Sequence, residues 1–127
     1  MSTQVDGQVD IFEQKNSKGR KIMIQNITIS KKEMEHINQL LNMTGEEIYQ
    51  KYGYKRDETI TKTAKFPNGI EADIKLVICE EEKPYTEGVL FDNGSEVACT
   101  EPDETYDGPW EFEYNGTEYV VNVTIEQ

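Results

Sequence analysis

Three Asn-Gly steps divide the second half of this chain into short segments. They occur at Asn68-Gly69, Asn93-Gly94 and Asn115-Gly116, and the segments between them alternate apolar and polar residues. Asn-Gly favours the positive φ angles of tight hairpin turns, and a period of two places alternate side chains on opposite faces of a strand. The pattern predicts an antiparallel meander sheet of five or six strands within residues 57–126. The expected strands are Thr59–Phe66, Ile70–Cys79, Tyr85–Phe91, Glu96–Thr100, Trp110–Tyr114 and Thr117–Ile125.

The preceding segment has helical spacing instead. Ser30 with Glu33, and Thr44 with Glu47, each match the S/T-x-x-E capping pattern that begins a helix. Gly53 stands where a left-handed residue ends one. The sequence predicts two short helices over residues 31–52, preceded by a strand at Lys21–Ile29. The apolar positions of these helices would then cover one face of the sheet, and they are Met34, Ile37, Leu40, Leu41 and Ile48.

The length of 127 residues fits one domain. We expect an α+β domain over residues 21–127 and a flexible N-terminal arm over residues 1–20, which is rich in Gln, Asp, Ser and Gly. The arm contains no apolar run typical of a signal peptide, which favours the cytoplasm of a bacterial host. In that reducing compartment Cys79 and Cys99 are expected to be small buried hydrophobes.

Charge is divided unevenly along the chain. Residues 1–65 contain 11 Lys/Arg and 9 Asp/Glu, whereas residues 66–127 contain 2 Lys/Arg and 16 Asp/Glu. Such an imbalance opposes compactness by self-repulsion, and it attracts basic molecules. Direct binding to DNA, RNA or an anionic membrane depends on basic residues. The composition therefore favours a basic protein as the partner.

The last hairpin concentrates part of this charge. If Asn115-Gly116 is a two-residue turn, Glu113 opposes Glu118 and both share with Glu111 the face away from the core. We expect Glu71 and Asp73 on a neighbouring strand to extend this surface. We further expect partner contacts from the loop and from aromatic anchors, namely Glu101, Asp103, Glu104, Tyr106, Asp107, Trp110 and Tyr85. The alternative is that these carboxylates, like Glu80-Glu81-Glu82, are merely solvated.

Two other features bear on metal binding and catalysis. Asp103 to Gly108 has the rhythm of a calcium loop, but Thr105 and Tyr114 stand where a ligand and a bidentate Glu are required. His36 lies within the first predicted helix and is expected to be exposed. No nucleophile has an evident base partner. We therefore expect a non-enzymatic protein with no catalytic residue, no metal and no cofactor.

A short motif in the arm offers a different function. Gln8, Val9, Asp10, Ile11 and Phe12 resemble the peptide with which proteins bind the bacterial sliding clamp, with Val9 and Ile11 in place of two Leu residues. Such a peptide needs a tether, a Gln that hydrogen-bonds the pocket wall and an aliphatic-aromatic pair to bury. This resemblance implies a replication or mobile-element accessory protein that docks on the clamp.

The domain itself resembles a group of small accessory proteins. The stretches GEEIYQKYG, KFPNGIEADIKLVIC, VLFDNGSEVAC and WEFEYNGTEYVVNV are similar to proteins carried by phages and integrative elements of Gram-positive bacteria. Small acidic proteins of mobile elements are often inhibitors of host defence, including anti-CRISPR proteins. Together with the charge, this resemblance implies an inhibitor whose acidic surface mimics nucleic acid and blocks a basic channel of a defence protein such as a CRISPR effector.

Overall fold

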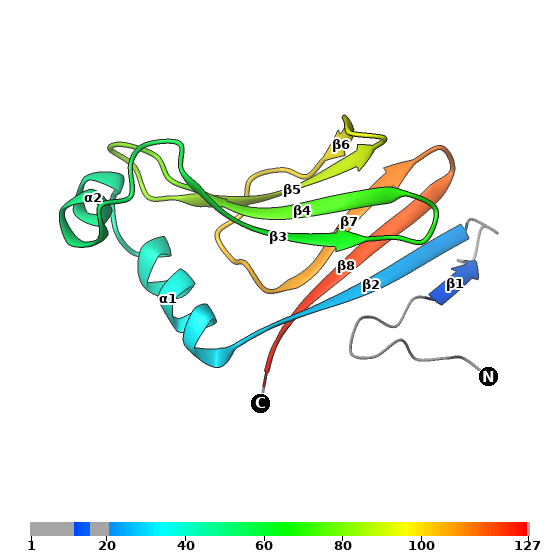
Figure 1. Cartoon of the computed structure of the whole chain (residues 1–127), viewed down its shortest axis with the longest axis horizontal. Helices are drawn as coiled ribbons and strands as arrows, with labels where there is room; N and C mark the ends of the chain where they lie inside the picture. The colour runs from blue at the N-terminus through cyan, green and yellow to red at the C-terminus, as the bar shows by residue number, and fades with distance from the viewer. Residues whose placement is uncertain (1–11, 16–20, 127) are drawn as a thin grey trace.

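The computed structural model describes residues 12–15 and 21–126 (Figure 1). The chain has an α+β fold with two helices. Its elements, in chain order, are β1 Phe12–Lys15, β2 Lys21–Ile29, α1 Lys31–Leu41, α2 Gly45–Tyr52, β3 Thr59–Lys65, β4 Ile70–Val77, β5 Tyr85–Asp92, β6 Ser95–Cys99, β7 Gly108–Tyr114 and β8 Thr117–Ile125. Most of the predicted arm lies outside the described residues, while β1 pairs with β2.

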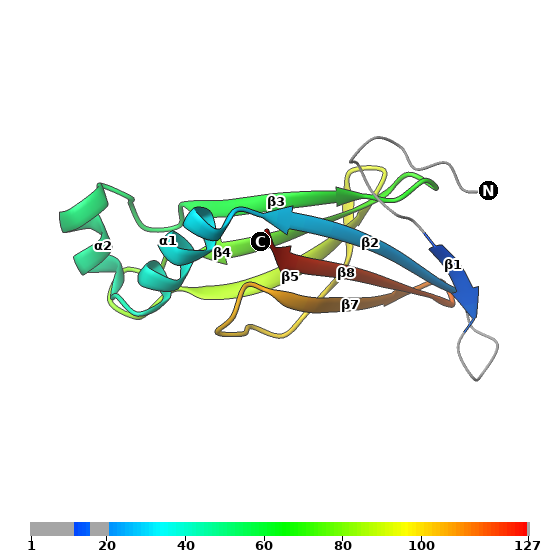
Figure 2. The same cartoon turned by 90° about the horizontal axis from the view of Figure 1, so that it is seen from below.

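The strands form two sheets, and the prediction of one meander sheet was wrong. β3, β4, β5 and β6 make an antiparallel sheet in chain order, here called sheet 2. Sheet 1 consists of β2, β8 and β7, with β1 added at its edge. Figures 1 and 2 show the two sheets as separate layers of a sandwich. Each sheet therefore covers the apolar face of the other, the role that the sequence assigned to the helices.

The division into two sheets follows from a long-range pairing. β2 runs parallel to β8 over its whole length, from Lys21 opposite Thr117 to Ile29 opposite Ile125. The β7–β8 hairpin therefore leaves the meander and joins the N-terminal strand. The connection from β6 to β7 crosses from sheet 2 to sheet 1 along one side of the sandwich (Figure 2).

Local features of the sequence were predicted more accurately. The Ser30 side chain accepts a hydrogen bond from the Glu33 amide, Thr44 and Glu47 form a complete capping box, and Gly53 ends α2 with φ of 81°. Asn93 and Asn115 both have positive φ and are followed by glycines with positive φ, as tight hairpins require. The expected hairpin register, with Glu113 opposite Glu118, is confirmed.

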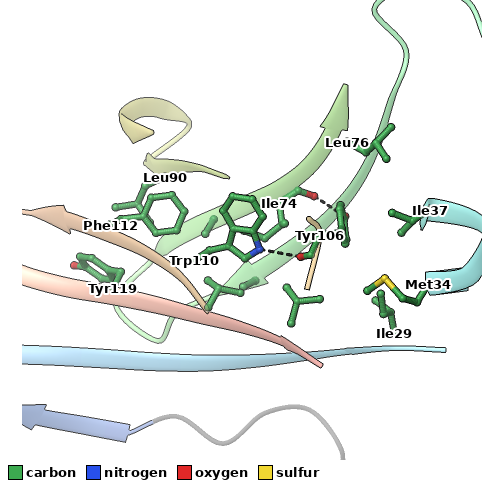
Figure 3. Packing of buried hydrophobic residues seen from close by; sticks show 14 of the residues in the cluster. Ile29, Met34, Ile37, Ile74, Leu76, Leu90, Tyr106, Trp110, Phe112 and Tyr119 are labelled. Carbon is green, nitrogen blue, oxygen red and sulfur yellow. Dashed lines mark hydrogen bonds between the residues drawn. The ribbon is translucent and has the colours of Figure 1, made fainter. Parts of the chain in front are cut away.

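The core lies between the sheets and continues under the helices at one end (Figure 3). Trp110 and Phe112 of β7 pack toward β5, where Gly88 has no side chain. A Cβ atom at this position would lie 2.7 Å from the Phe112 ring. Met34, Ile37 and Leu40 of α1 and Ile48 of α2 are buried, so the helices close the end of the sandwich rather than covering one face of a sheet.

Three side chains differ from their predicted environments. Cys79 is half-buried and Cys99 is exposed, because Cys99 lies on the outer face of the short edge strand β6. His36 is half-buried rather than exposed, since its ring lies 5.0 Å from that of Tyr52 and 6.1 Å from that of Tyr54. No helix in the described part of the chain is long and apolar enough to span a membrane.

Candidate protein-binding interface

The strongest chemical feature of the molecule is a C-terminal stretch that carries acidic residues and no basic ones. From Pro84 to Gln127 the chain has eleven Asp/Glu and no Lys or Arg. This stretch forms β5 to β8, and β6 and β7 are the edge strands of their sheets on the same side of the sandwich. We call the carboxylates of the β6–β7 connection and of β7 the acidic edge, which consists of Glu101, Asp103, Glu104, Asp107, Glu111 and Glu113.

The first part of the acidic edge is fastened to β5. The Thr86 and Asp103 main chains exchange two hydrogen bonds, of 2.8 and 2.9 Å, and the Thr86 hydroxyl donates to the Thr105 carbonyl at 2.6 Å. The Gly88 amide also donates to the Thr100 hydroxyl at 2.9 Å. Thr86 is fully buried. The loop therefore has a fixed path, and its carboxylates are held in place along the side of the sheet.

Tyr106 anchors the second part in the core. Its side chain is fully buried, and its hydroxyl donates to the Ile74 carbonyl of β4 at 2.7 Å. The Trp110 indole in turn donates to the Tyr106 carbonyl at 2.9 Å (Figure 3). Burial raises the pKa of the Tyr106 phenol above its ordinary value. The expectation that Tyr106 and Trp110 contact a partner was wrong, because both side chains pack between the sheets and Trp110 is only 5% exposed.

The last part of the acidic edge lies on the outer face of β7. Glu111 and Glu113 are exposed, while Trp110 and Phe112, which alternate with them along the strand, point inward. Glu113 stands directly opposite Glu118 of β8, as predicted. At the end of the hairpin the Tyr114 hydroxyl donates to Asp92 at 2.9 Å, which ties β7 to sheet 2 and raises the pKa of Tyr114. This part of the site therefore has the geometry expected from the sequence.

Glu71 and Asp73 do not belong to the same surface. Both lie on the outer face of β4 in sheet 2, where Glu71 is opposite Lys65 and Asp73 is opposite Thr63. The outer faces of the two sheets point in opposite directions, so the expected continuous surface with Glu111, Glu113 and Glu118 was wrong. The error arose from placing β4 and β7 in one sheet.

Two of the basic side chains form ion pairs with carboxylates outside the acidic edge. Among the described residues, Lys62 pairs with Glu33 at 3.0 Å and Arg56 pairs with Glu80 at 3.2 Å. Both pairs lie in the stretch that contains the helices, β3 and the start of the β4–β5 connection. Neither pair includes Glu101, Asp103, Glu104 or Asp107 of the β6–β7 loop, and these carboxylates can bind cationic groups of another molecule.

Other sequence predictions have a different status. Gln8, Val9, Asp10 and Ile11 of the clamp motif lie outside the described residues, and Phe12 begins β1 opposite Ile24. In the β6–β7 loop the Asp103 carboxylate accepts a hydrogen bond from the Glu104 amide. No group of three or more His, Cys, Asp or Glu in the described residues is arranged to hold a metal.

Sequence reasoning missed the residues that hold the loop in place. Thr86 and Thr100 resemble any other strand threonines, so nothing in the sequence marks their loop contacts. Tyr106 did give a signal, since it is the only large apolar side chain between Glu101 and Asp107. An isolated aromatic residue in a polar loop often packs against its own domain.

No family model, curated protein or solved structure matches this chain.

Proposed function

We propose that this chain is a non-enzymatic inhibitor that binds a basic protein through its acidic edge. The partner class is a host defence protein whose basic channel normally holds nucleic acid, such as a CRISPR effector. The observation that supports the proposal is the absence of Lys and Arg from Pro84 onward, in a stretch that contains every carboxylate of the acidic edge.

The arrangement of the acidic edge suits such a partner. Alternate residues of a strand lie about 6.8 Å apart, so Glu111 and Glu113 present a repeating row of negative charge. The β6–β7 loop continues this row with four further carboxylates on a backbone fixed by Thr86 and Tyr106. A preorganised row of charge loses little entropy on binding, and it steers association with a basic channel.

Competition with nucleic acid tests the proposal. Labelled target DNA bound to a purified CRISPR effector with its guide RNA would be titrated with this chain at about 50 and 200 mM salt. We expect displacement of the DNA, and weaker displacement at the higher salt concentration. Displacement that does not depend on salt, or its absence, would contradict nucleic-acid mimicry for this effector.

A matched pair of variants locates the contact. The first carries Glu101→Gln, Glu104→Gln, Asp107→Asn and Glu111→Gln, and the second carries Glu35→Gln, Glu46→Gln, Glu81→Gln and Glu126→Gln. Both lose four exposed carboxylates and have the same net charge. We expect only the first variant to lose competition. Equal losses would mean that net charge, rather than the acidic edge, determines binding.

The sliding-clamp prediction needs a separate experiment. Gln8→Ala with Val9→Ala alters the motif and leaves the β1 residues Phe12–Lys15 unchanged. Clamp binding that is lost in this variant and retained in the acidic-edge variant would support the replication accessory function instead.

A further inference from the structure

β3 is the terminal strand of sheet 2. Its only strand partner in the described part of the chain is β4, with Thr59 opposite Val77 and Lys65 opposite Glu71. A terminal strand presents a row of unpaired amide and carbonyl groups, and native proteins usually cover or interrupt such a row. The groups that β3 presents at this edge follow from its pairing with β4.

Two main-chain hydrogen bonds at the ends of the β3–β4 ladder fix the direction of each main-chain group of β3. The Phe66 amide donates to the Ile70 carbonyl at 2.8 Å, and the Ile78 amide donates to the Glu58 carbonyl at 3.0 Å. Even-numbered residues on this segment therefore direct their amide and carbonyl groups toward β4. The alternating residues direct theirs outward, and these are Thr59, Thr61, Thr63 and Lys65.

This outward row is suited to pairing with another strand. The side chains of its four residues are exposed on the outer face of sheet 2, and no main-chain hydrogen bond joins their outward groups to another described element. Threonine is a favourable strand residue, and Thr–Thr pairs across strands are stabilising. β3 contains no acidic residue, and it lies at the opposite end of sheet 2 from β6 and the acidic edge.

We propose that β3 is a self-association site, at which it pairs antiparallel with β3 of a second copy about a two-fold axis through Thr61. In this register Thr61 faces its own counterpart, and Thr59 faces Thr63 of the second copy. An axis through Lys62 would instead place two Lys62 side chains directly opposite each other, which is unfavourable. Pairing through Thr61 joins the two copies of sheet 2 into one continuous sheet.

The charge distribution is compatible with this arrangement. Because β3 and β6 are at opposite ends of sheet 2, the dimer places the two acidic edges far from each other. The net charge of −12 on each chain still opposes association at low ionic strength. Added salt screens this repulsion, so we expect dimerisation to increase with salt, whereas binding of a basic protein by the acidic edge decreases.

Sedimentation equilibrium of the full chain at low and high salt tests the proposal. We expect a reversible monomer–dimer equilibrium that shifts toward the dimer with concentration and with salt. Thr61→Pro removes the outward amide without removing a bond to β4, so the variant should be monomeric. Thr61→Lys places like charges in contact and should give the same result without the proline constraint. Thr61→Val retains the amide and should dimerise like the parent.

Cross-linking tests the register. In a background with Cys79→Ser and Cys99→Ser, Thr61→Cys should form an interchain disulfide, because directly opposite residues of antiparallel strands lie within disulfide reach. Thr63→Cys should not, since Thr63 faces Thr59 of the second copy and its counterpart lies four residue positions away along the strand. A parent chain that remains monomeric at all concentrations and salts would overturn the proposal. A Thr63→Cys disulfide without a Thr61→Cys disulfide would overturn the register.

Discussion

The outer faces of the two sheets carry acidic residues in different surroundings. On sheet 2, Glu71 faces Lys65, Glu87 faces Lys75, and the Asp73 carboxylate accepts a hydrogen bond from Thr63 at 2.7 Å. On sheet 1, Glu113 faces Glu118 and Glu111 faces Val120. On sheet 2 these carboxylates therefore lie opposite a lysine or a threonine hydroxyl. On sheet 1 they lie opposite another carboxylate or an apolar side chain.

This difference teaches that the net charge alone does not identify an interaction surface. A carboxylate that faces a lysine has part of its charge compensated across the ladder, whereas directly opposed carboxylates repel each other there. The acidic face of sheet 1 and the loop beside it are therefore the better candidate, although sheet 2 also carries several acidic residues.

The largest expected effect concerns the attachment of the acidic edge to sheet 2. Tyr106→Ala should lower the free energy of unfolding by about 3–5 kcal/mol, because it leaves a cavity at a fully buried position. Tyr106→Phe should cost about 1–2 kcal/mol, since it removes only the hydrogen bond to Ile74. Urea denaturation measures both values. Wild-type stability in the alanine variant would mean that the loop is not held by the core.

A smaller effect distinguishes the inner faces of the sheets. Gln25 of β2 is 4% exposed, and its Oε1 atom accepts no hydrogen bond in the described structure. Gln25→Met should therefore raise the free energy of unfolding by about 1 kcal/mol.

The matched control for Gln25 is Thr86 of β5, which is buried with its hydroxyl bonded to Thr105. Thr86→Val should lower stability by a similar amount. If both substitutions have the same sign in thermal or chemical denaturation, the contrast between the inner faces is incorrect.

The smallest effect tests the outer faces directly. Glu113→Gln with Glu118→Gln should raise the free energy of unfolding by a few tenths of a kcal/mol, because an opposed like-charge pair is removed. Glu71→Gln should lower it by a similar amount, because Lys65 loses the charge opposite it. Both changes should shrink in about 1 M salt. Denaturation at two salt concentrations would show whether the signs differ.

Local sequence signals predicted the elements well, but they could not predict the partition into sheets. Capping residues and Asn-Gly turns act within a few positions, which is why the helix starts and the β7–β8 register were predicted correctly. Which strand pairs with β8 depends on contacts between distant segments. The connection that contains Tyr106 carries β7 into the second layer, where β8 pairs with β2.

For the same reason, only part of the acidic interface could be predicted from the sequence. Alternation correctly placed Glu111, Glu113 and Glu118 on an outer face, since that inference needs only one hairpin. Placing Glu71 and Asp73 on the same surface required knowing which sheet contains β4. Neither the sequence of β4 nor that of the β7–β8 hairpin determines this. Trp110 shows the same distinction, because its alternation with Glu111 predicts an inward side chain, whereas its aromatic character alone suggested a surface anchor.

The parallel pairing of β2 with β8 has a consequence for the time at which the chain can fold. Asn26 and Asn122, which hydrogen-bond across this ladder, are 96 positions apart in the sequence. Chains dominated by such distant contacts form their native topology slowly. During synthesis β2 leaves the ribosome well before β8, its neighbour in the centre of sheet 1. The edge of β2 that pairs with β8 must therefore remain unpaired until β8 has been synthesised.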